Sequence, residues 1–175
     1  MDTDVEAVLN RSVRPLLVSR GYVASGHLYR HLVEFGTYAI FDFGVRPWIP
    51  GQRLMQAKFG VVLHKPRPWL PQDLQEQVAT DPGIEKAQFW GALLPPGHYA
   101  CDVPITEWSL RDGQSLDPIG PLMVDRIETA ALPLIAAVLQ GERRMAELDH
   151  PDAVTSGRAP QFINAPLGEP LYRDW

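Results

Sequence analysis

A histidine and a cysteine three positions apart are the first residues that could carry out chemistry. His98, Cys101 and the following Asp102 have the types and spacing of a base, a nucleophile and an orienting carboxylate, with Glu107 nearby. Catalysis requires the His98 ring within hydrogen-bond reach of an exposed Cys101 thiol. No enzyme signature surrounds these residues, and a lone cysteine is more often a small core residue. They are therefore weak catalytic candidates, and a non-enzymatic protein is favoured.

Basic and aromatic residues form a second set, spread over the loops around a predicted strand. Its members are Arg46, Trp48, Arg53, His64, Arg67 and Trp69. Arginine and tryptophan are enriched in the residues that dominate protein interfaces. The set therefore predicts a binding rim for a protein partner. Packing of these loops against the core is the competing interpretation.

The histidine pair His27 and His31 has the i, i+4 spacing that shares a metal ion on a helix. On a strand the same spacing separates them by about 13 Å, too far for one ion. No Cys and His set has zinc spacing, and no G-x-G-x-x-G, Walker or G-x-S-x-G motif occurs. We therefore expect neither a metal nor a cofactor.

Charge limits the choice of partner. The formal net charge of −5 argues against nucleic-acid binding, which usually requires a basic face. Residues 43–70 hold five basic residues and no acid, whereas residues 71–128 hold ten acids and three basic residues. Such asymmetry is typical of a solvated polar surface, or of a dipolar face that steers a charged partner.

Cellular location is predicted from three features of the chain. Cys101 is the only cysteine, which fits a reducing compartment. The N-terminal "MDTDVEAVL" lacks the basic and apolar regions of a secretory signal. The longest apolar runs fall far short of the ~20 residues of a membrane helix. We expect a cytoplasmic protein without membrane contact.

Periodicity of apolar residues predicts an α+β fold. Residues 3–20 have helical spacing, with Pro15 expected to kink or divide the helix and Gly21 to end it. Period-two patterns over 27–33, 37–45 and 56–64 predict an antiparallel meander, and the first pattern puts His27, Tyr29 and His31 on one face. The expected apolar face of the other two strands consists of Ala39, Phe41, Phe43, Val45, Ala57, Phe59, Val61 and Leu63.

The second half of the chain is rich in proline. Residues 70–79 predict a short surface helix, 87–94 are ambiguous, and 98–110 alternate like one or two broken strands. Residues 117–140 predict a second long helix, bent at Pro133. We expect one domain over 1–148, with an antiparallel sheet of three to five strands and both long helices on one face. Residues 149–175 are expected to be an extended tail that packs on the domain or on a neighbour.

Several segments resemble a small bacterial family catalogued as domain of unknown function 4304. "VLNRSVRPLLVSRGY" is similar to its N-terminal helix, "LYR", "AIFDFG" and "KFGVVL" to its strands, "EWSL" to its Trp-containing segment and "ETAALPLI" to its last helix. The resemblance covers roughly residues 5–140 and brings no catalytic residues. Some small acidic bacterial proteins of this general type look like immunity proteins encoded beside secreted toxins.

Three functions stay open. The favoured one is a protein-binding module, in its narrowest form an immunity protein, and it predicts an exposed acidic patch drawn from Glu76, Asp81, Glu85, Asp112 or Asp117. The second is an enzyme or small-molecule binder with a site around His98 and Cys101, in which polar groups converge in a pocket. The third is a structural homo-oligomer, for example a homodimer, whose tail clasps a neighbouring copy.

Overall fold

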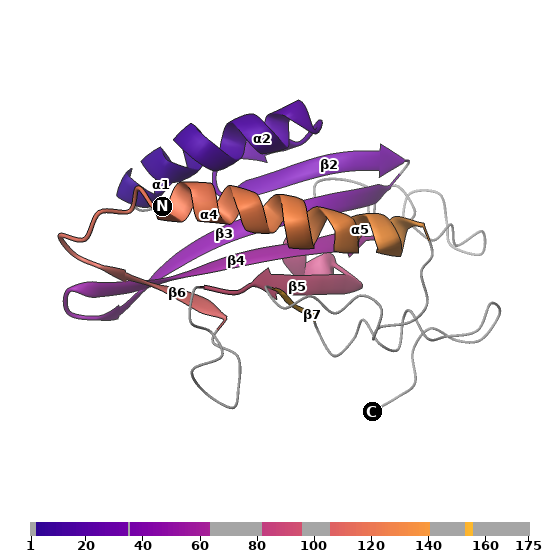
Figure 1. Ribbon diagram of the computed structural model, residues 1–175. Helices are drawn as coiled ribbons and strands as arrows, with labels where there is room; N and C mark the ends of the chain where they lie inside the picture. Colours follow the sequence, from indigo (N-terminus) through magenta and orange to yellow (C-terminus); the bar gives the residue numbers. More distant parts are fainter. Residues whose placement is uncertain (1–2, 35, 64–81, 96–105, 141–152, 156–175) are drawn as a thin grey trace, which may run out of the picture.

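Two long helical segments lie over one antiparallel sheet (Figure 1). The computed structural model describes residues 3–34, 36–63, 82–95, 106–140 and 153–155. The strands are β1 (Val23–Ser25), β2 (Leu28–Glu34), β3 (Thr37–Ile49), β4 (Gln52–Val62), β5 (Phe89–Leu93), β6 (Glu107–Arg111) and β7 (Ala153–Thr155). The helical elements are α1 (Thr3–Val8), η1 (Leu9–Val13), α2 (Arg14–Ser19), η2 (Ile84–Lys86), α4 (Ile119–Arg126), η4 (Ile127–Ala131) and α5 (Leu132–Leu139).

The sheet is built around β4. Its strand order is β1-β2-β3-β4-β5-β7, and β6 also pairs with β4. β5 pairs with Lys58–Val61 and β6 with Gln52–Gln56, so β5 and β6 lie end to end along the side of β4 that faces away from β3. The indole Nε1 of Trp108 in β6 donates to the Leu93 carbonyl oxygen at the end of β5, at 3.0 Å. This bond ties the two collinear strands together.

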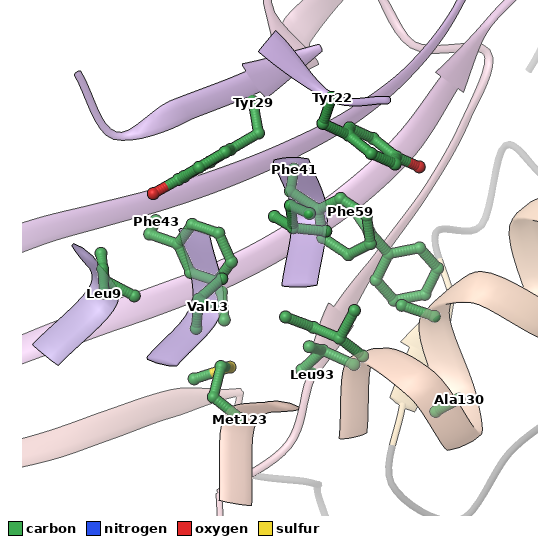
Figure 2. Close-up of a cluster of buried hydrophobic side chains, with 14 of the residues drawn as sticks. Leu9, Val13, Tyr22, Tyr29, Phe41, Phe43, Phe59, Leu93, Met123 and Ala130 are labelled. Carbon is green, nitrogen blue, oxygen red and sulfur yellow. The ribbon is translucent and has the colours of Figure 1, made fainter. Parts of the chain in front are cut away.

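Period-two alternation decides which side chains enter the core. Phe41 and Phe43 of β3 and Phe59 of β4 are fully buried, because odd-numbered positions of both strands point towards the helices. Figure 2 shows these rings with Tyr29 of β2, and with Leu93 and Met123 from later elements. The Phe41 and Phe59 ring centroids are 6.4 Å apart, within the range in which aromatic pairs attract. The expected apolar face and the helix-covered side of the sheet are therefore the same.

The opposite face of the sheet holds a smaller buried cluster. Ile40, Val62 and Ala87 are its buried members, and four half-buried residues pack against them: Leu28, Tyr38, Ile84 and Trp90. Most of the polar side chains described below lie on this face, which we call the open face because the long helices cover the other one.

Both long helices pass through a proline without breaking. A π-helical turn, η1, immediately precedes the α-helix in which Pro15 is at the start, and η4 does the same before Pro133. Proline lacks the amide that would bond one turn back, and its ring crowds the carbonyl there. A wider turn relieves this crowding, so each helix continues in π form at the position where sequence predicts a bend.

Glycine allows the close contacts of the helices. The chain leaves α2 at Gly21, whose φ of 86° lies in the left-handed region, and the Tyr22 amide donates to the Leu17 carbonyl at 3.0 Å. At Gly120 in α4, an added Cβ would lie only 2.8 Å from the Cβ of Ser12 in η1. The absence of a side chain at Gly120 thus sets how closely the two helical segments approach.

The α+β fold with an antiparallel sheet and the two long helices on one face is confirmed. The described sheet has seven strands rather than the expected three to five, because the short strands β1 and β7 extend its two edges. One detail of the first predicted strand is wrong. His27 does not share a strand face with Tyr29, because Gly26, with a φ of 61°, and His27 form the turn between β1 and β2. The short strand β1 was missed because three residues carry too little alternation to register.

Some predictions for the second half of the chain fall on described residues, and others do not. The ambiguous residues 87–94 contain strand β5, and β6 occupies Glu107–Arg111 at the end of the alternating stretch. In the predicted tail, Ala153–Thr155 forms β7, whose backbone pairs with Gly91–Leu93 of β5. The predicted helix over 70–79 and the rest of the tail lie outside the described residues.

Candidate binding surface

Only part of the predicted binding rim can be placed. Arg46, Trp48 and Arg53 belong to the long β3–β4 hairpin. His64, Arg67 and Trp69 lie outside the described residues, as do the weak catalytic candidates His98, Cys101 and Asp102. The surface described below is therefore built from the hairpin and from strand β6 beside it.

The far end of the hairpin carries two exposed apolar side chains. Trp48 is 56% exposed and Ile49 is 54% exposed, although both are large and hydrophobic. The pairing of β3 with β4 shifts register between Pro47 and Ile49, and Gly51 turns the chain with a φ of 78°. Because the hairpin extends beyond the part of the sheet that the helices cover, these side chains find no core to enter (Figure 1).

Arg46 is fixed against both a carboxylate and a ring. Its Nη2 donates to Glu107 Oε1 at 2.9 Å and to Oε2 at 3.0 Å, and its Nε donates to Oε1 at 3.1 Å. The same guanidinium lies 5.2 Å from the centre of the Trp48 ring. Gln56 Nε2 also donates to Glu107 Oε1, at 2.9 Å, and holds the carboxylate in place. Arg46 therefore connects strand β6 to the exposed tryptophan.

Arg53 does not join Arg46 in one basic rim. In the register of the hairpin Arg46 lies opposite Leu54 and Arg53 opposite Pro47, so the two arginine side chains point to opposite faces of the sheet. Only 22% of the Arg53 side chain is exposed, and its Nη2 is 3.4 Å from a carboxylate oxygen of Asp112. We name the surface formed by Arg46, Trp48 and Ile49 the hairpin patch.

A groove lies between β6 and the start of α4. Its volume is about 350 Å3. Residues of β6, of α4 and of the turn between them line it, together with Pro95 after β5: Pro95, Glu107, Trp108, Ser109, Gln114, Ser115, Pro118, Ile119 and Leu122. Glu107 belongs to this lining and also binds Arg46, so the groove adjoins the hairpin patch. No sequence motif marks the groove, because its lining residues come from separate elements and share no spacing.

An Asp–His pair occupies the open face. Asp42 Oδ1 lies 3.5 Å from Nε2 of His27, and the Asp42 side chain is 20% exposed. Burial raises the pKa of the Asp42 carboxyl above its ordinary value, against the opposing effects of His27 and Lys58. His31, the other member of the predicted pair, hydrogen-bonds instead with the Gly21 carbonyl oxygen through Nδ1, at 3.0 Å. The two histidines therefore serve separate structural contacts.

The acidic residues expected to form a patch are partly neutralised. Asp112 pairs with Arg53, and Asp117 pairs with Arg11 at 3.0 Å. Glu85 is exposed, and Glu76 and Asp81 lie outside the described residues. Of the three candidates in the described part of the chain, Asp112 and Asp117 thus each belong to a separate ion pair.

Comparison with known proteins finds no protein-family model, no curated protein and no solved structure that matches this chain. The resemblance to the bacterial family therefore stays a prediction. In the described residues, no helix combines the length and apolar character needed to span a membrane.

Proposed function

We propose that this protein is a non-enzymatic protein-binding module and that the hairpin patch is its principal contact. The observation that carries the proposal is the exposure of Trp48 and Ile49 beside an arginine that Glu107 already holds in place. Tryptophan and arginine are the residue types most enriched in interface hot spots. A large apolar side chain gains most when a partner removes it from water.

The fixed position of Arg46 supports this function on energetic grounds. An immobile side chain loses less conformational entropy on binding than one that is free in solution. The contacts to Glu107 and Trp48 hold the guanidinium before a partner arrives, and Gln56 holds the carboxylate in turn. Arg46 is nevertheless half exposed, with 50% of its side chain accessible, so a partner can reach it.

An immunity-type protein that binds a secreted toxin is the narrower form of the proposal. It is supported by the family resemblance and by the formal net charge of −5, which would complement a basic toxin. The hairpin patch would then supply the apolar centre of the interface, and the net negative charge of the chain its long-range attraction. The enzyme and tail-clasping alternatives depend on residues outside the described part of the chain.

The test is an affinity pull-down of the tagged protein from its native host, read by mass spectrometry at low and high salt. We expect one stoichiometric partner, a second copy of the chain being among the candidates. A Trp48→Ala variant should weaken the purified complex by about 30-fold or more, the effect of losing a hot spot. Leu32→Ala is the matched control, because Leu32 is also 56% exposed but lies on β2, away from the hairpin end.

Each outcome of this comparison is informative. Both variants should unfold within about 0.5 kcal/mol of the wild-type protein, because exposed side chains contribute little to stability. Equal affinities for the wild-type and Trp48→Ala proteins would refute a role for the hairpin patch. Failure to capture any stoichiometric partner would count against the binding-module function as a whole.

A further inference from the structure

Strand β6 has a free outer side within the described residues. β6 pairs with β4 on one of its two sides and with no described strand on the other. The neighbouring collinear strand β5, in contrast, pairs with β7 on its outer side. The position that continues the line of β7 alongside β6 thus holds no described strand. Exposed strand edges present unpaired amides and carbonyls, and they are sites where another extended chain can add.

Hydrogen bonds at the end of β6 show which of its backbone groups face outward. The Asp112 amide donates to the Gly51 carbonyl oxygen at 2.9 Å, so the backbone groups of residue 112 point towards the β3–β4 hairpin. Because the direction of the backbone amide and carbonyl alternates along a strand, these groups of Leu110 and Trp108 also point towards β4. The backbone groups of Ser109 and Arg111 point outward. The Val61 carbonyl, which accepts from the Gln88 amide at 3.1 Å, points to the same side of β4 as the Gly51 carbonyl. The two residues are an even number of positions apart, as the alternation requires.

The groove runs beside this outward-facing edge. Trp108, Ile119 and Leu122 give it an apolar lining, and Ser109 lies on its β6 side. At the end of β6, Arg111 is exposed and forms no ion pair with another described residue. Within the described residues, β6 therefore has a backbone edge without a neighbouring strand, borders an apolar groove and carries a cation that forms no ion pair.

We propose that an extended peptide segment of a partner protein adds to the outer side of β6 as a further strand. An aliphatic side chain of that segment enters the groove, and an acidic side chain an odd number of positions along, on the opposite face of the added strand, pairs with Arg111. The segment's backbone bonds to the outward groups of Ser109 and Arg111. This inference rests on the proposed protein-binding function and names the form of partner that it recognises.

The shared residue Glu107 explains how one partner would use both surfaces. Glu107 lines the groove and binds Arg46, so a strand docked on β6 begins next to the hairpin patch. The hairpin patch would then take a bulky group of the partner, and the β6 edge its extended segment. Backbone pairing gives affinity in this mode, and alternate side chains give specificity.

The probe is a phage-displayed library of random ten-residue peptides panned on the intact protein. We expect selected sequences that combine alternating aliphatic residues with an acid. Binding of one selected synthetic peptide is then titrated against Ser109→Pro and Ser109→Ala. Proline at this position removes only an outward amide and is tolerated on an edge strand, so it should weaken binding about ten-fold or more. Ser109→Ala loses the same side-chain bond to Gln52 and should bind within about three-fold of wild type.

Arg111→Gln tests the charge. It should weaken the peptide several-fold and reduce the dependence of affinity on salt, because the expected acid loses its partner. Amide hydrogen exchange tests strand addition without any variant of the protein. The amides of Ser109 and Arg111 should exchange rapidly in the free protein and slow down when the peptide binds.

The outcomes separate this inference from the proposed function. A selected peptide that binds Ser109→Pro and wild type equally, without protecting the Ser109 and Arg111 amides, overturns strand addition. Failure of the library to yield any binder, while Trp48→Ala still loses the natural partner, also overturns strand addition but leaves the binding module standing. Loss of binding in Ser109→Pro with an unchanged thermal unfolding curve supports it.

Discussion

Replacement of Trp108 by phenylalanine should destabilise the protein strongly, although phenylalanine is also aromatic and apolar. Trp108 is 3% exposed, and its indole donates to the carbonyl of Leu93, a fully buried residue. Phenylalanine cannot donate this bond, so the Leu93 oxygen loses its partner in the interior. A buried group left without a hydrogen bond costs about 1–3 kcal/mol.

The smaller ring adds a packing cost to the lost bond. Exchange of an indole for a phenyl ring removes a few buried atoms, at roughly 1–2 kcal/mol. The two effects together predict a loss of about 2–5 kcal/mol from a total stability that is usually about 5–15 kcal/mol. Trp48→Phe makes the same chemical change at an exposed site and should cost no more than about 0.5 kcal/mol.

Urea denaturation followed by far-ultraviolet circular dichroism measures both variants without relying on tryptophan fluorescence. With a urea slope of about 2 kcal/mol per molar, the Trp108→Phe midpoint should fall by about 1–2.5 M and the Trp48→Phe midpoint should barely move. Equal midpoints for the two variants would refute the reasoning, because the joint between β5 and β6 would then contribute nothing. A changed slope would instead show that the compactness of the denatured or native state has changed, or that the variant no longer unfolds in one step.

Two further predictions concern pH. Burial raises the pKa of the Tyr22 phenol well above its ordinary 10.0. The folded state therefore holds this proton more tightly than the unfolded chain, and stability should fall as pH rises past about 10. Tyr22→Phe should make this decline shallower in urea denaturation between pH 9 and 11, and an unchanged decline would contradict the assignment. The pKa of Asp42 is also raised, by burial first, so its contribution to stability is present below the ordinary value of 3.8 and is lost as pH rises through the folded-state pKa. Asp42→Asn should consequently be at least as stable as wild type at pH 7, with a difference that shrinks towards pH 3, and a clearly less stable variant at pH 7 would show that the contact with His27 outweighs burial.

The sheet could be predicted where its pattern is long and unambiguous. In β3 and β4 the apolar residues alternate over many positions, and a shift by one residue would turn Phe41 and Phe59 out of the core. The two long helices could also be predicted, because their apolar stripes extend over several turns. Short strands such as β1 could not be predicted, since three residues fit several conformations equally well.

The candidate surface was harder to predict because its parts come together only in three dimensions. Trp48 and Arg46 could be selected by residue type, and the structure shows them in contact. Glu107, however, is 61 positions from Arg46, and in the sequence it stands out only as a neighbour of Cys101. Residue type alone predicts one rim for Arg53 and Arg46, because composition does not report which face of a strand a residue occupies. Register and pairing partners decide such questions, and neither can be read from one sequence.

The three partners of β4 also impose an order on folding. The β3–β4 hairpin joins residues that are close in the chain, whereas Gln52 meets Arg111 of β6 only after a far longer loop has closed. The hairpin is thus the element that the folding nucleus can form first, and β5, β6 and β7 add to an edge that already exists. Substitutions in the middle of the hairpin should slow folding, and substitutions in β6 should chiefly accelerate unfolding. A chain held at the hairpin stage would expose the whole β4 edge, and such an edge is where pairing between chains begins.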